Sequence, residues 1–351
     1  MFFASDNWAG AHPRIAKKLE KNAAGFSAGY GSGDLDKQVY KTFSEIFERE
    51  VAVFFVATGT AANALSLSSV NRPGGVTFCH RSAHIVEDEC GAPEFFTGGA
   101  RLCPVDGPLG RMDPALLQQA IARYPAEFVH SGQPMAISIT QATELGTLYS
   151  LDDIEDISVI AAENGLPLHM DGARFANALV ALDTTPAEMT WKRGVDILSF
   201  GGTKNGCWCA EAVILFDLDK AREFAFLRKR AGQLFSKSRF ISAQFDAYFE
   251  DGLWLETARH ANAMATRLAD SIRTSRSARL GWEPQANEVF PILKKSDVER
   301  LKGEGAVFYD WHAPAGFDGE IAIDETLCRL VTSFATTYED VERFSALLPN
   351  K

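Results

Sequence analysis

Short apolar runs rich in β-branched residues alternate with stretches of helical periodicity, and this alternation limits the possible folds most strongly. The expected strands lie at residues 51–58, 75–82, 100–105, 136–143, 167–173, 196–201 and 211–216. Helical periodicity is clearest at residues 59–70, 114–124, 151–164 and 218–229. Alternating strands and helices are typical of a largely parallel sheet with helices on both faces. We therefore predict an α/β fold.

The pattern changes after about residue 250. A long amphipathic helix is expected at residues 253–273, followed by strands at 289–294, 307–311 and 328–334 and a final helix at 338–348. These elements predict a small α+β domain. We expect a large domain over residues 1–250 and a small one over 251–351, with the N-terminal segment able to pack elsewhere.

The composition is that of a globular enzyme. The 351 residues are 46% hydrophobic and 23% charged, which suffices for a large core. A net charge of −11 argues against nucleic acid and anionic membranes as partners. The first residues lack a basic and apolar signal segment, and no apolar run reaches the roughly eighteen residues that span a bilayer. The six cysteines are expected to be buried free thiols, which favours the cytoplasm.

Lys204 stands in a glycine-flanked loop, and Asp171 precedes it by 33 positions at the end of an expected strand. A lysine that forms a Schiff base and an acid that pairs with a pyridine nitrogen are what pyridoxal phosphate (PLP) requires. The alternatives are a solvated loop lysine and a structural pair between Asp171 and Arg174. His169 shares a strand face with Asp171 and is expected to be a hydrogen-bonded structural histidine.

The segment Thr58-Gly59-Thr60 follows an expected strand and opens a helix. Free backbone N–H groups and the helix dipole make such a turn suitable for a phosphate, and the hydroxyl of Thr203 can add to the same shell. The alternative is an ordinary turn in which Thr58 or Thr60 caps the helix.

His84 follows the next expected strand. At that place in a PLP site an aromatic ring stacks on the pyridine, and a histidine can also transfer protons. His80 and His84 have the spacing of zinc ligands, with Glu87 and Glu89 nearby, but no third ligand motif completes such a site.

Several motifs together resemble the L-threonine aldolase family, which belongs to the fold-type-I PLP enzymes and groups with the β-eliminating lyases. The resemblance covers nearly the whole chain. It implies a mostly parallel seven-stranded sheet in a large domain and a small C-terminal α+β domain. The motifs are Ser5-Asp6-Asn7, Tyr30-Gly31-Ser32-Gly33-Asp34, the 58–63 turn, Ala83-His84, the 169–174 segment, Thr203-Lys204 and Cys328-Arg329-Leu330-Val331-Thr332.

The resemblance also implies roles toward the cofactor. Lys204 matches the Schiff-base lysine, Asp171 the pyridine partner and Arg174 its neighbour on the cofactor. His84 matches the histidine that stacks on the ring, and Lys229 matches a basic residue near the phosphate.

Toward the substrate, Ser5 and Arg329 match residues that hold the carboxylate. His130 falls where the family often has a second active-site histidine. Tyr30 is expected to bind substrate and, with its glycine-rich loop, to cross between subunits. The resemblance also implies a homo-oligomeric assembly, a dimer of dimers.

The chain departs from better-known members of the family at three places. A Glu-Asn-Thr-His segment is replaced here by Thr140-Gln141-Ala142-Thr143-Glu144, and Thr203-Lys204-Asn205-Gly206 stands where many have Ser-Lys-Gly. A family arginine near the phosphate falls at Ser236, with Lys237 and Arg239 as possible substitutes.

The implied reaction is cleavage of L-threonine, L-allo-threonine and related β-hydroxy-α-amino acids to glycine and an aldehyde. Either His84 or His130 is expected to act as the base. The alternatives are another PLP-dependent β-eliminating lyase, an aminotransferase, a phenylserine-type aldolase, and a PLP-binding protein without activity.

Overall fold

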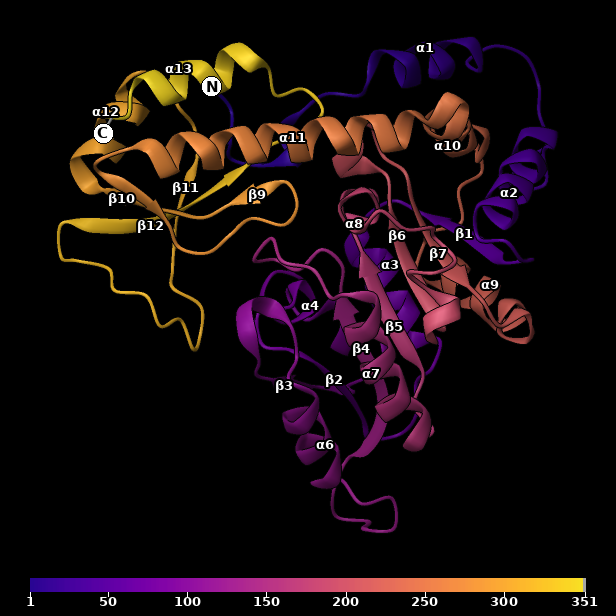
Figure 1. Cartoon of the computed structure of the whole chain (residues 1–351). Helices are drawn as coiled ribbons and strands as arrows, with labels where there is room; N and C mark the ends of the chain where they lie inside the picture. Colours follow the sequence, from indigo (N-terminus) through magenta and orange to yellow (C-terminus); the bar gives the residue numbers. More distant parts are fainter. Residues whose placement is uncertain (350–351) are drawn as a thin grey trace.

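The computed structural model describes residues 1–349, which form two β-sheets bridged by one long helix, α11 (Leu253–Thr274) (Figure 1). Helix α11 packs on helix α8 (Phe175–Leu182) beside the first sheet and on the strands of the second. The functional consequence is that side chains from both sheets can meet near this helix.

The first sheet has seven strands in the order β1-β7-β6-β5-β4-β2-β3. Strand β7 runs antiparallel to both neighbours, and the other strand pairs of this sheet are parallel. The seven predicted strands and the mostly parallel sheet are therefore confirmed. The strands are β1 (Ala52–Val56), β2 (Gly75–His80), β3 (Arg101–Val105), β4 (Gln133–Thr140), β5 (Leu168–Gly172), β6 (Ile197–Gly201) and β7 (Glu211–Leu215).

Helices cover both faces of this sheet, as predicted. The four helices predicted from periodicity are present, although the one expected at 218–229 is a short 3₁₀ turn followed by α9. Others were not predicted. The α-helices of this part are α1 (Pro13–Lys21), α2 (Asp34–Ile46), α3 (Gly59–Ser68), α4 (His84–Glu87), α5 (Ala92–Phe96), α6 (Pro114–Ala122), α7 (Leu151–Glu163), α8, α9 (Ala221–Arg230) and α10 (Arg239–Phe249).

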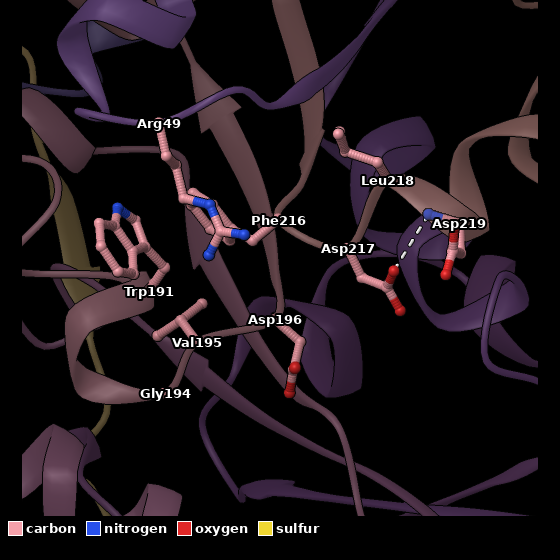
Figure 2. Close-up of a pocket in the computed structure, with 9 residues that line it drawn as sticks. All are labelled: Arg49, Trp191, Gly194, Val195, Asp196, Phe216, Asp217, Leu218 and Asp219. Carbon is pink, nitrogen blue, oxygen red and sulfur yellow. Dashed lines mark hydrogen bonds between the residues drawn. The ribbon is translucent and has the colours of Figure 1, made fainter.

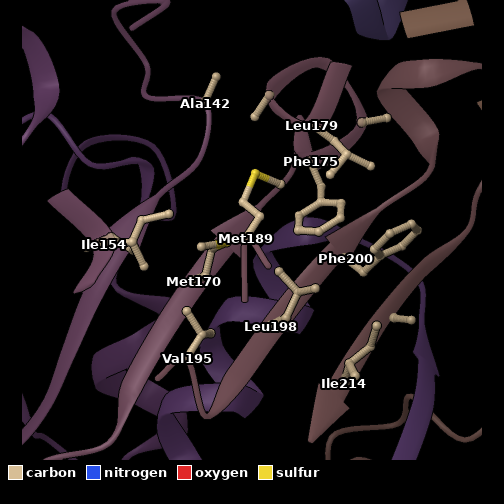
Figure 3. Packing of buried hydrophobic residues seen from close by; sticks show 14 of the residues in the cluster. Ala142, Ile154, Met170, Phe175, Leu179, Met189, Val195, Leu198, Phe200 and Ile214 are labelled. Atoms are coloured by element: carbon tan, nitrogen blue, oxygen red, sulfur yellow. The ribbon is translucent and has the colours of Figure 1, made fainter. Parts of the chain in front are cut away.

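The alternation of side chains along β5 and β6 sends the two sets of side chains to opposite faces of the sheet. Met170, Leu198 and Phe200 point toward Phe175 and other apolar side chains of the main core (Figure 3). Their neighbours in sequence, including Asp171, point to the opposite face, where α3 lies. The strands thus place polar groups under α3 and a dry core on the other side.

The second sheet has five strands, β8 (Ala278–Leu280), β9 (Glu288–Val289), β10 (Pro291–Lys294), β11 (Tyr309–Trp311) and β12 (Glu325–Val331). Helices α12 (Lys295–Gly303) and α13 (Tyr338–Ala346) accompany it. The strands and helices predicted after residue 250 are confirmed, whereas β8 and α12 were not predicted. The division into domains 1–250 and 251–351 stays a proposal.

The first residues of the chain pack with this second sheet. The backbone N–H of Phe3 donates to Val307 over 2.8 Å, and that of Val331 donates to Phe3 over 2.8 Å. The chain then forms a short 3₁₀ helix, η1 (Asp6–Trp8), which contacts the loop after β6. The N-terminal segment therefore connects the two sheets.

All six cysteines are free, but the expectation that they are buried holds for only half of them. Cys90 is exposed in the turn before α5, Cys103 is half-buried on the edge strand β3, and Cys209 is half-buried in the loop before β7. Within residues 1–349, no helix is both long and apolar enough to cross a membrane.

Candidate active site

A cavity of about 300 Å³ lies at the carboxyl ends of the parallel strands. Most of its lining residues follow β1, β2, β5 or β6 in the sequence, because the carboxyl ends of these strands lie at the same edge of the sheet. Its lining consists of Asn7, Ala57, Thr58, Gly59, Thr60, Asn63, His84, Asp171, Ala173, Thr203, Lys204 and Glu211.

The first turn of α3 borders this cavity. The hydroxyl of Thr58 accepts from the N–H of Ala61 over 3.1 Å, so Thr58 is the helix cap that the alternative interpretation proposed. This cap leaves the N–H groups of Gly59 and Thr60 in the first turn available to an anion. A Cβ atom on Gly59 would meet no atom within 4 Å, so the space before the helix is open.

Asp171 is a buried carboxylate that two neutral donors hold. The amide of Asn63 donates to Oδ2 over 2.7 Å, and the N–H of Ala173 donates to Oδ1 over 3.0 Å. Among residues 1–349 Asp171 forms no ion pair, so the alternative of a pair with Arg174 is wrong. A buried carboxylate without a cation is unfavourable, which is compatible with the pyridine partner that the sequence analysis predicts for it.

Lys204 lies in a short 3₁₀ turn, η4 (Thr203–Asn205), between β6 and β7. Asn205, which departs from the family pattern, anchors this turn by donating to Tyr248 Oη and to the carbonyl of Trp254, each over 2.8 Å. A Cβ atom on Gly201 would lie 2.5 Å from the carbonyl oxygen of Ala173. Only glycine lets the strand before Lys204 approach the strand of Asp171 so closely.

Two buried glutamates near these residues were not predicted. Glu211 accepts from the N–H of Thr203 over 3.2 Å, and burial raises its pKa to about 7. Glu89 accepts from the amide of Asn63 over 2.8 Å and lies 2.9 Å from His84 Nδ1. This bond raises the pKa of His84, whereas burial raises the pKa of Glu89.

Asn63 therefore donates to both Glu89 and Asp171. A continuous chain of side chains runs from His84 through Glu89 and Asn63 to Asp171. These hydrogen bonds fix the orientation of the His84 ring relative to the carboxylate of Asp171.

A second polar cluster is centred on Arg174. Its Nε and Nη2 donate to Asp6 over 2.7 and 3.2 Å, and Asn287 donates to the same carboxylate over 3.1 Å. Burial alone would raise the pKa of Asp6, but the charge of Arg174 holds it below its ordinary value. Nη1 of Arg174 is buried without a hydrogen-bond partner in the described part of the chain, and Glu144 Oε2 lies 3.9 Å from it.

Arg329 reaches this cluster from β12. Its guanidinium lies over the ring of Trp311, 4.1 Å from the centroid, and its Nε is buried with no partner among the described residues. The carboxylate of Glu288 lies between the two arginines, 3.4 Å from Arg174 Nη2 and 4.0 Å from Arg329 Nη1. The ion pair between Arg329 and Glu288 is thus only a long contact.

The sequence profile of a family described as beta-eliminating lyase matches residues 3–296. The chain belongs to this family. A low specificity L-threonine aldolase of Pseudomonas sp. (strain NCIMB 10558) is 40% identical over 314 residues, and one of Pseudomonas aeruginosa is 38% identical over 314 residues. Each alignment covers 90% of this chain and 90% of the relative.

A solved threonine aldolase of Leishmania major superposes with a TM-score of 0.90 at 29% identity and covers 99% of this chain and 98% of its own. A putative L-allo-threonine aldolase of Listeria monocytogenes superposes with a TM-score of 0.72 over 97% of this chain and 94% of its own, and at 17% identity it supports the fold alone. The predicted fold class and family resemblance are confirmed.

The fold of this beta-eliminating lyase corrects the expectation for His130. The residue is exposed in the turn before β4, where its ring packs on Phe128. Because β4 runs parallel to β5, its amino end lies at the edge of the sheet opposite Asp171. The chain therefore brings His84, but not His130, to the cavity.

Four other residues named in the sequence analysis do not line this cavity. Lys229 is exposed on α9. Tyr30 is 59% exposed, with its backbone N–H donating to Ser236. Ser5 accepts from the N–H of Asn7 as the cap of η1 and lines a separate hollow of about 220 Å³. Arg239 donates to the carbonyl of Gly25 over 3.0 Å, away from the cavity.

His169 is confirmed as a satisfied structural histidine. It lies 2.8 Å from Ser138 Oγ and 2.9 Å from Ser199 Oγ, and burial lowers its pKa to about 4. The ring of His80 contacts the carbonyl of Gly107 and the N–H of Ser82. Residues 1–349 contain no group of three or more His, Cys, Asp or Glu side chains placed to hold a metal.

Another hollow, of about 450 Å³, lies at the opposite edge of the sheet, before β6 and after β7 (Figure 2). Arg49 lies over the ring of Trp191 there, and Asp196, Asp217 and other residues complete the lining. None of the predicted catalytic residues reaches this hollow.

Proposed function

We infer that this protein is a PLP-dependent carbon–carbon lyase that cleaves L-threonine and related β-hydroxy-α-amino acids to glycine and an aldehyde. The observation that carries the proposal is the meeting of Lys204, Asp171 and the open first turn of α3 in one cavity. The similarity to low specificity L-threonine aldolases over 90% of the chain supports the same reaction.

We propose that Lys204 binds the cofactor and that Asp171 faces its ring nitrogen. When bound, PLP supplies a carbonyl for the lysine and an electron-withdrawing ring for the bond that breaks. Asp171 keeps the ring nitrogen protonated, because its two neutral donors leave its charge uncompensated. The N–H groups of Gly59 and Thr60 hold the phosphate at the helix end.

The substrate carboxylate binds to Arg329 and Arg174 in this proposal. Arg329 Nε and Arg174 Nη1 are buried donors without protein partners in the described chain, and a carboxylate satisfies both. Trp311 supports the guanidinium of Arg329 without using its N–H groups. Fixing the carboxylate also fixes which bond of Cα breaks.

His84 is the proposed base. Glu89 engages its Nδ1, so Nε2 is the ring atom that remains to accept the proton of the β-hydroxyl group. The raised pKa of His84 strengthens it as a base near neutral pH. Asn63 keeps Glu89 in place.

We also propose a cytoplasmic homo-oligomer. Exposed aromatic residues near the N-terminal part of the chain, with Trp8 at 55% and Tyr30 at 59%, favour contact with a second copy. Tyr30 and Lys229 keep their predicted roles only if such a contact completes the site. Light scattering that finds an active monomer at assay concentration would refute the assembly.

The reaction is tested by borohydride reduction of the protein with PLP, followed by peptide mapping, and by product analysis with L-threonine. We expect the pyridoxyl group on Lys204, with glycine and acetaldehyde as products. Lys41→Ala, at an exposed position on α2, serves as the lysine control and should label normally. Label on another lysine, or pyruvate and ammonia from L-serine without threonine cleavage, would overturn the proposal.

A further inference from the structure

Glu288 is a carboxylate with an unusual position at the start of β9. It is fully buried, yet neither of its oxygens has a hydrogen-bond partner in the chain that the structure describes. Within residues 1–349 its only close cations are Arg174, at 3.4 Å, and Arg329, at 4.0 Å. Asp6 differs, because it accepts two hydrogen bonds from Arg174 and one from Asn287.

The cluster around Glu288 contains more negative than positive groups. Arg174 approaches it from the start of α8 and Arg329 from β12. Asp6 of η1 and Glu144 of the loop after β4 are the other carboxylates that act on it. The charge of Lys204 also acts on Asp6 and Glu144, but in the proposed function this lysine is bound to the cofactor, as the amino group of the substrate will be. The remaining three carboxylates against two guanidinium groups leave one excess negative charge, and a substrate carboxylate would make this two. A buried site disfavours such an excess, so binding favours uptake of a proton.

Glu288 is the group most suited to take that proton. Although burial acts against the charge of Asp6 and Glu144, nearby cations keep the pKa of both below the ordinary value. Burial raises the pKa of Glu288 to about 7, because no hydrogen bond stabilises its charged form. A Cβ atom added to Gly146 would lie 3.0 Å from Glu288 Cβ, so the loop after β4 packs closely against the base of this side chain.

We propose that Glu288 pairs with Arg174 and Arg329 in the free enzyme and takes up a proton from solvent when the α-carboxylate of an amino acid binds there. One carboxylate thereby replaces another beside the same two arginines, and no other bond changes. The inference rests on the proposed function, in which these arginines hold the substrate. It identifies a residue that sets affinity for α-carboxylates according to pH.

The sign of the pH dependence follows. Below pH 7 Glu288 is already neutral, and the arginines are free for substrate. Above pH 7 the charged Glu288 competes with the substrate carboxylate for the two arginines. The apparent KM therefore rises with pH until Glu288 is ionised in the complex as well. The amino group of the substrate titrates in the wild type and in a Glu288→Gln variant alike, so the ratio of their KM values isolates Glu288.

The first test is calorimetry at pH 8 of the PLP-loaded enzyme with glycine, in two buffers of different ionisation enthalpy. Methylamine, which has the amino group without the carboxylate, is the reference ligand. We expect the enzyme to take up roughly one proton more when it binds glycine than when it binds methylamine. Glu288→Gln should abolish the difference, whereas Glu283→Gln, at an exposed position, should retain it. Equal uptake for the two ligands in the wild type would overturn the inference, and this measurement needs no variant to fold.

The second test is the KM for L-threonine from pH 6 to pH 9. The ratio of wild type to Glu288→Gln should be flat at low pH and rise toward roughly 100-fold at pH 9, at tenfold per pH unit above a pKa of about 7. A flat ratio throughout would overturn the inference. Arg329→Lys separates the two proposals. If it raises KM while proton uptake is absent, only the role of Glu288 fails; if it leaves KM unchanged, the carboxylate site itself is wrongly placed.

Discussion

Replacing Glu89 by glutamine tests the chain of side chains that holds His84. Glu89 Oε1 lies 2.9 Å from His84 Nδ1 and receives a second hydrogen bond from Asn63. Glutamine keeps the size of the side chain and an oxygen that can accept, but it removes the negative charge. The pKa of His84 should therefore fall.

The size of the fall follows from the bond that is weakened. A hydrogen bond to a charged group is worth about 1.5–3 kcal/mol, and a neutral one about 1 kcal/mol. The difference of about 0.5–2 kcal/mol corresponds to a fall of about 0.4–1.5 in the pKa of His84 at 1.36 kcal/mol per unit. His84 is only 29% exposed at its side chain, so solvent does not remove most of this effect.

The assay is an NMR titration of the histidine rings in the protein without and with PLP. His84→Asn identifies the resonance among the seven histidines. Glu87→Gln, an exposed position on the same short helix, is the matched control and should leave the pKa in place. If His84 acts as the base, the acidic limb of the kcat profile should move by the same amount. A His84 pKa that is equal in the wild type and Glu89→Gln would refute the reasoning.

Three further outcomes are expected. Asp6→Asn should destabilise the fold by about 3–5 kcal/mol in urea denaturation, because it breaks a buried ion pair in which Arg174 donates two hydrogen bonds; a loss below about 0.5 kcal/mol, the ordinary range for surface changes, would contradict this. Gly201→Ala should weaken PLP binding, measured by absorbance titration, because its Cβ would lie 2.5 Å from the Ala173 carbonyl oxygen. His130→Ala should change kcat/KM by less than about twofold, within the usual effect of an exposed surface substitution, and a larger loss would place His130 in a site after all.

The residues that sequence reasoning brought together correctly share one property. Asp171, Lys204 and the 58–60 turn each follow an apolar run that forms a strand. Because parallel strands end at the same edge, position after a strand suffices to place them together. The same rule argues against His130, which precedes the strand at Gln133–Thr140 and so belongs to the other edge.

The buried acids could not be found in this way. In the sequence, Asp6, Glu144 and Glu288 look like the solvated acids common in any protein of this composition. Their burial arises only when η1, the loop after β4 and β9 meet around Arg174. The family's Glu-Asn-Thr-His segment is replaced here by a segment that ends at Glu144, and this departure was a partial signal. However, the residues around an acid in the sequence do not indicate which arginine it will contact in the fold.

The site joins segments that are far apart in the sequence, and this separation affects when the site forms during folding. Asn63 and Asp171 are 108 positions apart, Asp6 and Arg174 168, and Asp6 and Asn287 281. Contacts between such remote segments form late in folding, because each requires closure of a long loop after both ends have become ordered. A chain still emerging or partly refolded therefore has no complete site to bind the cofactor. PLP binding stabilises the finished fold by mass action and marks the end of folding rather than assisting its start.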